Sequence, residues 1–166
     1  MKKAPLFLLG ITLLLSIFPV NAFADDSQLH RAVDEVVGTP YKWGGTTTEG
    51  FDCSGFILHI FKQYDIKLPR TSKSQSNVGE KVGKDELRPG DLLFFNTNGK
   101  GVSHAGIYLG EGEFAHSSSK RGVSISKLSD SYYKTRYVTA RRVASGEQYE
   151  DMSGIVHEDD DDVPVE

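Results

Sequence analysis

The order of hydrophobic patterns along the chain predicts an α+β fold, with helices first and an antiparallel sheet after them. Apolar residues recur at helical spacing in two early segments, residues 27–37 and 53–64. The later apolar or alternating segments are as short as strands, at residues 92–95, 103–109, 113–116, 123–125 and 136–143. Helices and strands that are segregated in this way are typical of an α+β domain. We expect about five or six strands.

The two helical segments have clear boundaries. In residues 27–37 the apolar positions lie three or four residues apart, and Gly38-Thr39-Pro40 ends the helix. The second helix has its apolar face at positions 56, 57, 60, 61 and 64, and Cys53 lies in its first turn. A helix start is therefore expected to carry this cysteine.

The segment 103–109 predicts a strand that places His104 and Gly106 on the same face. A three-residue hairpin loop at 110–112 then puts His116 opposite Gly106. In that register the two histidines share a face as diagonal neighbours, with Cβ atoms ~7–8 Å apart. A bulge in the loop would instead place one histidine on the other face.

Residues 1–24 have the pattern of a signal peptide. Lys2 and Lys3 precede an apolar run at 6–20, and Ala22-Phe23-Ala24 is a small-x-small cleavage site. A retained membrane anchor is the alternative, but the run is shorter than the ~20 residues that span a bilayer. No cysteine lies near the cleavage site for a lipid. We therefore expect export without a stable membrane anchor, into the periplasm, the cell wall or the medium.

The remaining chain divides by charge into one domain at 25–144 and an acidic tail at 145–166. Removing the first 24 residues takes the net charge from −4 to −6, and the tail holds nine acidic residues without any Lys or Arg. We expect this tail to be disordered because it has few apolar residues to bury. The rest is mildly basic without a dense basic stripe, which favours an anionic polymer over nucleic acid as partner. We expect a monomer.

Cys53 is the only cysteine, so in an exported chain it has no disulfide partner. It is either an inert buried side chain or a reactive thiol. A helix start stabilises a thiolate, Asp52 opposes it, and a neighbouring imidazolium would favour it. His104 and His116 then complete a nucleophile–base–orienter arrangement. Zinc binding by these three residues is an alternative that no metal-ligand spacing in the sequence supports.

Six motifs occur together in the segment 29–143. They are Pro40-Tyr41-Lys42-Trp43-Gly44-Gly45, Phe51-Asp52-Cys53-Ser54-Gly55-Phe56, Leu68-Pro69-Arg70-Thr71-Ser72, Arg88-Pro89-Gly90-Asp91-Leu92, Ser103-His104-Ala105-Gly106-Ile107-Tyr108 and Phe114-Ala115-His116-Ser117-Ser118. In this order they resemble the NlpC-type cysteine peptidases, a papain-like family that cleaves bacterial peptidoglycan. One departure is Ala105, where many relatives have valine.

The resemblance implies a papain-like fold and a role for each matching residue. Cys53 matches the nucleophile, His104 the general base and His116 the residue that orients the base. Four further residues match positions on the oxyanion or substrate side of the cleft, with a surface salt bridge as the alternative for the last: Tyr41, Asp52, Ser54 and Arg70. No metal or organic cofactor is implied.

The resemblance also implies the reaction. The family's usual substrate is the peptidoglycan stem peptide, cut between D-γ-glutamate and diaminopimelate or lysine. Two alternatives stay open, namely an acyltransferase or amidase on the same fold and a non-catalytic wall-binding module. The chain lacks the separate wall-binding repeats that the family often carries, so its targeting is open.

Overall fold

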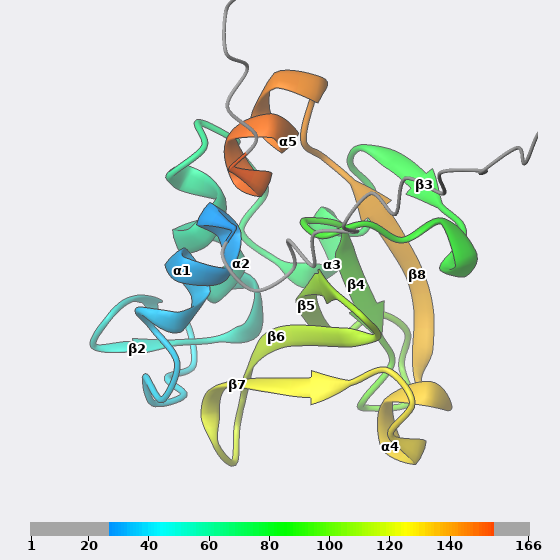
Figure 1. Ribbon diagram of the computed structural model, residues 1–166. Helices are drawn as coiled ribbons and strands as arrows, with labels where there is room; N and C mark the ends of the chain where they lie inside the picture. The colour runs from blue at the N-terminus through cyan, green and yellow to red at the C-terminus, as the bar shows by residue number, and fades with distance from the viewer. Residues whose placement is uncertain (1–26, 155–166) are drawn as a thin grey trace, which may run out of the picture.

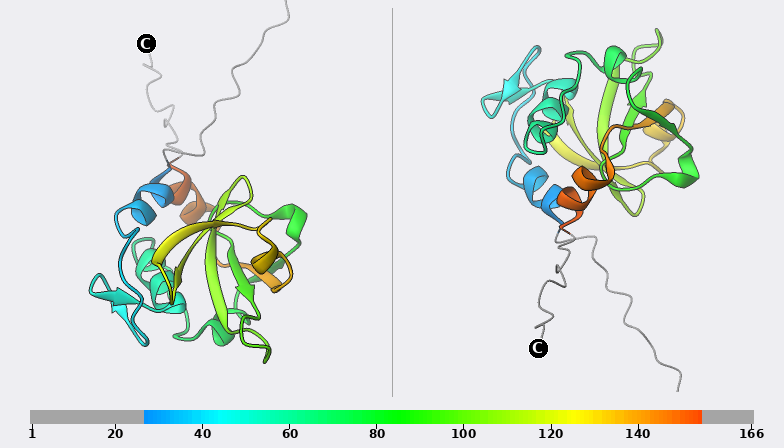
Figure 2. Two further views of the ribbon diagram at one scale, coloured as in Figure 1. Left: turned by 90° about the horizontal axis from the view of Figure 1, so that it is seen from below. Right: turned by 90° about the horizontal axis from the view of Figure 1, so that it is seen from above.

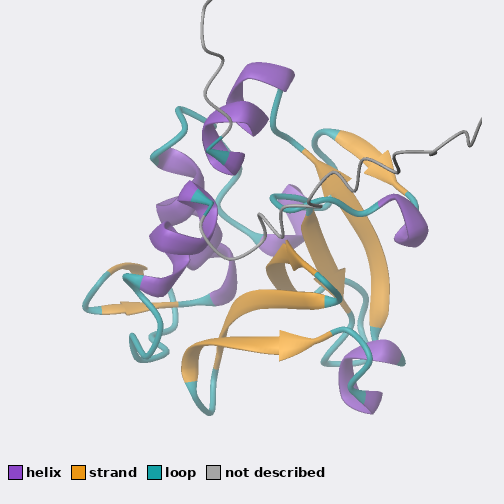
Figure 3. Ribbon diagram, in the orientation of Figure 1, coloured by secondary structure: helices purple, strands orange, loops and turns teal. Residues whose placement is uncertain are grey.

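The computed structural model describes residues 27–154; the predicted signal peptide at 1–24 and residues 155–166 lie outside this range. Helices α1 (Gln28–Asp34) and α2 (Cys53–Lys62) pack together beside a sheet formed by the second half of the domain (Figure 1). Figure 3 shows α1 and α2 together on one side of the main sheet, whereas short helical turns lie beside the strands themselves. The predicted α+β fold is confirmed. No helix within 27–154 combines the length and the apolar character needed to cross a bilayer.

The main sheet has six strands in the order β3-β8-β4-β5-β6-β7, and each neighbouring pair is antiparallel. Its strands are β3 (Glu80–Val82), β4 (Leu92–Phe95), β5 (His104–Gly110), β6 (Glu113–Ser118), β7 (Gly122–Lys127) and β8 (Tyr137–Arg142). Before this sheet in the chain come a two-stranded sheet of β1 (Thr46–Thr47) and β2 (Gly50–Phe51) and the short helix α3 (Ser72–Gln75). The 3₁₀-helix η1 (Lys84–Glu86) connects β3 to β4, and α4 (Ser131–Lys134) connects β7 to β8.

Strand β4 lies in the middle of the sheet and is buried on both faces. Leu92 and Phe94 pack with the helices, whereas Leu93 and Phe95 pack in a second cluster on the opposite face. A strand that is covered on both sides has no reason to alternate with polar residues, which explains the unbroken apolar sequence.

The β5–β6 hairpin has the predicted register where the histidines lie. Ile107 pairs with Ala115 and Tyr108 with Phe114, and the register shifts only between Tyr108 and Gly110, on the loop side. The irregularity therefore leaves both histidines on one face, as predicted. Gly106 makes this approach possible, since a Cβ there would lie 2.7 Å from a Phe114 ring carbon.

The predicted disorder of the tail is wrong for its first part. Residues 146–153 form helix α5 (Gly146–Ser153), which begins with a capping box between Ser145 and Gln148. Met152 is fully buried in the core beside the helices, and α5 lies against α1 (Figure 2). One well-placed apolar side chain and a capped helix start thus order a segment whose composition is acidic.

Candidate active site

Cys53 is the first residue of α2, and the loop before the helix packs closely on this turn. The Asp52 carboxylate accepts the Gly55 N–H at 2.7 Å and so caps the helix. A Cβ on Gly55 would lie 2.0 Å from the Gly45 carbonyl oxygen, so only glycine permits this approach. The motifs around Trp43 and Cys53 are thus two sides of one contact.

Burial raises the pKa of the Cys53 thiol, and the Asp52 carboxylate raises it further. The backbone N–H groups of Ala105, Ser54 and Cys53 itself act in the opposite direction without cancelling the effect. The expectation that a helix start and an imidazolium would give a thiolate is therefore wrong for the free protein. At neutral pH the thiol keeps its proton until a base removes it.

The two predicted histidines form a hydrogen-bonded pair. His104 Nε2 lies 2.9 Å from His116 Nδ1, and the two rings are nearly perpendicular, at 88°. Burial lowers the pKa of His104 to about 4 and that of His116 to about 3, with the charge of His104 adding to the shift at His116. Both rings are therefore neutral at pH 7. A neutral imidazole can accept a proton.

Two residues that were not predicted from the sequence lie within hydrogen-bond distance of His116, on the side away from His104. The Ser126 hydroxyl lies 3.0 Å from His116 Nε2, and the Tyr133 hydroxyl lies 3.3 Å from the same nitrogen. Ser126 is paired with Phe114 across β6 and β7, which places it on the histidine face. Extending the predicted strand at 123–125 by one residue would have found it. Tyr133 lies in the short helix α4, which no pattern in the sequence predicted.

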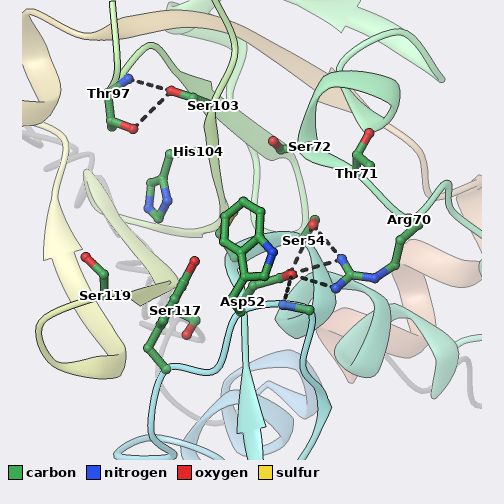
Figure 4. A pocket seen from close by; sticks show the side chains of 14 residues that line it. Asp52, Ser54, Arg70, Thr71, Ser72, Thr97, Ser103, His104, Ser117 and Ser119 are labelled. Carbon is green, nitrogen blue, oxygen red and sulfur yellow. Dashed lines mark hydrogen bonds and ion pairs between the residues drawn. The ribbon is translucent and has the colours of Figure 1, made fainter.

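The predicted residues meet in a cleft of about 420 Å³ (Figure 4). Its lining is Tyr41, Trp43, Gly44, Asp52, Cys53, Ser54, Arg70, Thr71, Ser72, Thr97, Ser103, His104, Ser117 and Ser119. His116 is not part of the lining, because it is fully buried behind His104. No group of three His, Cys, Asp or Glu side chains between residues 27 and 154 is arranged to hold a metal ion.

Arg70 is hydrogen-bonded to both residues that flank Cys53 in the chain, Asp52 and Ser54. Its Nη1 donates to Asp52 Oδ1 at 3.0 Å and to Ser54 Oγ at 2.9 Å, and its Nη2 donates to Asp52 Oδ2 at 2.5 Å (Figure 4). Burial raises the pKa of Asp52, but the hydrogen bonds from Arg70, Gly55 and Ser54 and the charge of Arg70 outweigh this and lower it. Arg70 thus forms the salt bridge considered as its alternative role and also lines the cleft.

Two aromatic residues border the cleft near Cys53. Burial raises the pKa of Tyr41, and the charges of Cys53 and Asp52 raise it further, so the phenol stays protonated and can donate. Trp43 is 88% exposed although it is the largest apolar side chain of the cleft. Trp43 belongs to one of the six motifs, but its position in the sequence alone indicates no role for it.

Comparison with known proteins confirms the resemblance to the NlpC-type family. Residues 38–142 match the NlpC/P60 family. The probable endopeptidase NlpC of Escherichia coli K12 is 44% identical over 132 residues, covering 75% of this chain and 86% of that protein. The gamma-DL-glutamyl hydrolase of Bacillus subtilis is 43% identical, covering 70% of this chain but only 29% of that protein.

A third relative is the murein DD-endopeptidase MepS/murein LD-carboxypeptidase of E. coli K12. It is 43% identical over 109 residues, and these residues cover 65% of this chain and 57% of the relative. Among solved structures, an NlpC/P60 family protein from Bacillus cereus superposes with a TM-score of 0.68 at 42% identity, covering 74% of this chain and 40% of that one. The chain therefore belongs to the NlpC/P60 family.

Proposed function

We propose that this protein is an exported cysteine endopeptidase that hydrolyses amide bonds in peptidoglycan stem peptides. The preferred bond is the one between D-γ-glutamate and diaminopimelate or lysine. Family membership and the activities by which the relatives are named support a peptidoglycan hydrolase. The residues that line the cleft, Cys53 and His104 among them, support the cysteine mechanism.

One observation carries the mechanism: the His104–His116 hydrogen bond uses Nε2 of His104. The other ring nitrogen, Nδ1, is then available to the cleft that His104 and Cys53 both line. A base needs its partner on one nitrogen and the nucleophile on the other. In the matching tautomers, His104 Nε2–H donates to His116, and His116 Nε2–H donates to Ser126.

The reaction begins from a neutral pair. His104 Nδ1 takes the thiol proton as Cys53 Sγ attacks the scissile carbonyl, so that no free thiolate has to persist in the buried site. The imidazolium then protonates the departing amine, and a thioester remains on Cys53. His104 next takes a proton from water, which attacks the thioester and releases the acid.

The developing negative charge meets donors that are already in place. The backbone N–H groups of Ala105, Ser54 and Cys53 face the Cys53 sulfur, and the protonated Tyr41 hydroxyl lines the same cleft. Donors that are fixed before the reaction stabilise an oxyanion without a reorganisation cost. Arg70 uses both oxygens of Asp52 and also donates to Ser54 Oγ, so we propose that this group fixes the first turn of α2 beside the nucleophile.

The cleavage experiment identifies both the enzyme class and the bond. Purified protein is incubated with defined muropeptides, and the products are identified by mass spectrometry. We expect a new amine at the diaminopimelate or lysine residue, and no product from Cys53→Ala. Lys127→Ala, at an exposed position of β7 that does not line the cleft, serves as the control that a substitution elsewhere leaves the activity unchanged.

Three other results would contradict the proposal. Transfer of the acyl group to an amine acceptor would indicate an acyltransferase. Cleavage of a DD or LD bond alone would match the activity for which the E. coli relative MepS is named. Full activity in Cys53→Ala would exclude the thiol mechanism.

Export is the second part of the proposal. We propose that residues 1–24 are a signal peptide and that the peptidase domain begins after them, so that the protein reaches its wall substrate outside the inner membrane. The mass of the mature protein from secreting cells tests this directly. We expect a chain that begins at Asp25, and the full-length mass would contradict export with cleavage.

A further inference from the structure

The hydrogen bonds that begin at His104 do not end at Ser126. The Tyr133 hydroxyl lies 3.3 Å from His116 Nε2, the nitrogen that also lies 3.0 Å from the Ser126 hydroxyl. Tyr133 and Ser126 are hydrogen-bonded to each other as well. Two hydroxyl groups therefore share one ring nitrogen of the buried histidine, and the proposed mechanism gives Tyr133 no task.

The direction of these hydrogen bonds decides whether His104 can act as a base. A neutral imidazole carries a proton on one nitrogen and accepts on the other. If a hydroxyl donates to His116 Nε2, the His116 proton lies on Nδ1 and is donated to His104 Nε2. The His104 proton then lies on Nδ1, the nitrogen that has to take the thiol proton. His104 is a base only if His116 donates to the hydroxyls instead.

Ser126 alone favours the unproductive direction. Its side chain is buried, and within residues 27–154 its hydroxyl has His116 and Tyr133 as its hydrogen-bond partners. A buried hydroxyl proton that finds no acceptor costs free energy. Without the Tyr133 oxygen, the Ser126 proton would therefore be donated to His116 Nε2.

Tyr133 offers a second acceptor for the Ser126 proton and has an outlet for its own. Its side chain is only partly buried, and it lines a hollow of about 440 Å³ together with Arg121 and Asp130. Burial raises the pKa of the phenol more than the hydrogen bond with Ser126 and the charge of Arg121 lower it, so the phenol keeps its proton. Water that enters an open, charged hollow can accept this proton.

The ring of Tyr133 is held in place by packing that does not involve the hydroxyl. It packs edge-to-face on Phe114, with ring centroids 4.9 Å apart, and on Phe95, with ring centroids 5.4 Å apart. Phenylalanine at position 133 would keep both contacts and lose only the hydrogen bonds. Tyr133→Phe therefore tests the hydroxyl by itself.

We propose that Tyr133 is a positioning residue that sets the direction of the hydrogen bonds from His104 outward, an inference that rests on the proposed function and adds a residue to it. Ser126 donates to the Tyr133 oxygen, and Tyr133 donates to water in the hollow. The Ser126 oxygen then accepts from His116 Nε2–H, and His116 Nδ1 accepts from His104. Tyr133 does not line the cleft, so it acts only through the histidines.

Steady-state kinetics on one muropeptide test the direction through a second substitution. Tyr133→Phe should lower kcat about tenfold with KM within about twofold, because the loss of one hydrogen bond shifts His104 toward the inactive tautomer. Adding Ser126→Ala removes the donor that causes this shift, so the double variant should be about threefold faster than Tyr133→Phe or better. A double variant no faster than Tyr133→Phe, or Tyr133→Phe with the wild-type kcat, overturns the proposal.

The matched control is Tyr132→Phe, which removes the neighbouring phenol hydroxyl from the same hollow. The Tyr132 ring lies 4.1 Å from the Arg136 guanidinium, and within the described residues its hydroxyl has no hydrogen bond to either histidine. Tyr132→Phe should keep the wild-type kcat and KM. A loss equal to that of Tyr133→Phe would contradict a specific role for Tyr133.

The tautomers of the free protein test the same proposal without a substrate. NMR chemical shifts of the imidazole nitrogens distinguish a protonated from an unprotonated nitrogen, and His104→Ala assigns the signals. At neutral pH, where burial keeps both rings uncharged, we expect the proton on Nε2 of His104 and of His116. In Tyr133→Phe we expect it on Nδ1 of both. Identical tautomers in the two proteins overturn the proposal, whereas failure of the proposed function would show separately, as no cleavage of any muropeptide.

Discussion

At the scale of single residues, the site depends on which nitrogen of each imidazole carries a proton. His116 is fully buried, and its two nitrogens lie within hydrogen-bond distance of His104 on one side and Ser126 on the other. A ring held in this way has one fixed orientation and favours one tautomer. We therefore propose that His116 has a positioning role and acts on the substrate only through His104.

Two substitutions of His116 distinguish its role as a hydrogen-bond acceptor for His104 from the space that its side chain fills. His116→Ala should lower kcat about 100-fold with little change in KM, because His104 loses the acceptor that fixes its tautomer. His116→Asn should stay within about tenfold of wild type, since an amide oxygen can take the place of Nδ1. Steady-state kinetics on one muropeptide measure both. Equal kcat values for the two variants would contradict the positioning role.

At the scale of elements, the sequence predicted the helix and the strands that carry Cys53 and the two histidines. It did not predict the residues that contact His116 from neighbouring elements. Helical spacing placed Cys53 at a helix start, and strand alternation with a short loop placed the two histidines on one face. Both follow from local periodicity. Ser126 and Tyr133 come from segments whose contacts with His116 are set by tertiary packing, which periodicity does not encode. The prediction of a lowered pKa for Cys53 was wrong for a similar reason. The motif at the helix start does not show that the folded domain buries the thiol, and burial raises its pKa.

Helix α5 is a second case in which tertiary packing decides a feature that the sequence pattern does not predict. Its acidic composition predicted disorder, but Met152 finds a buried position beside Gly90 that only the folded domain creates. A single apolar contact between distant segments is invisible to composition. The twelve residues after Gly154 are outside the described structure.

The contact between the loop before α2 and its first turn can be tested with one methyl group. Gly55→Ala places a Cβ 2.0 Å from the Gly45 carbonyl oxygen, so we expect the free energy of unfolding to fall by at least about 2 kcal/mol. Gly146→Ala is the matched control, because a Cβ at this first position of α5 has open space around it. It should be neutral or stabilise by up to about 1 kcal/mol. Urea unfolding of both variants decides, and equal stabilities would contradict the close contact.

At the scale of the whole molecule, the buried histidine pair links the site to overall stability. The pKa values of His104 and His116 lie near 4 and 3 in the folded protein, below the 6.5 of an unperturbed histidine. The unfolded chain therefore binds protons first as the pH falls. The stabilisation is complete above pH 6.5 and is lost progressively as the pH approaches the folded values.

Thermal and urea unfolding between pH 7 and pH 4.5 should show this loss. The two shifted pKa values together predict that the free energy of unfolding falls by about 5 kcal/mol over this range, with about half from each ring. His116→Asn, which cannot titrate here, should show a clearly shallower dependence. A wild-type curve that is flat between pH 7 and pH 4.5 would mean that the histidines are not held neutral by burial.

The central claim is that Cys53 forms a thioester with the substrate's acyl group, with His104 as its base. The most direct measurement is peptide mapping by mass spectrometry after acid quench during turnover of a muropeptide. We predict that the peptide containing Cys53 gains the mass of the acyl fragment, that His104→Ala shows little or none of it, and that hydroxylamine removes it. Continued turnover without any adduct on Cys53, or turnover by Cys53→Ala, would contradict the account.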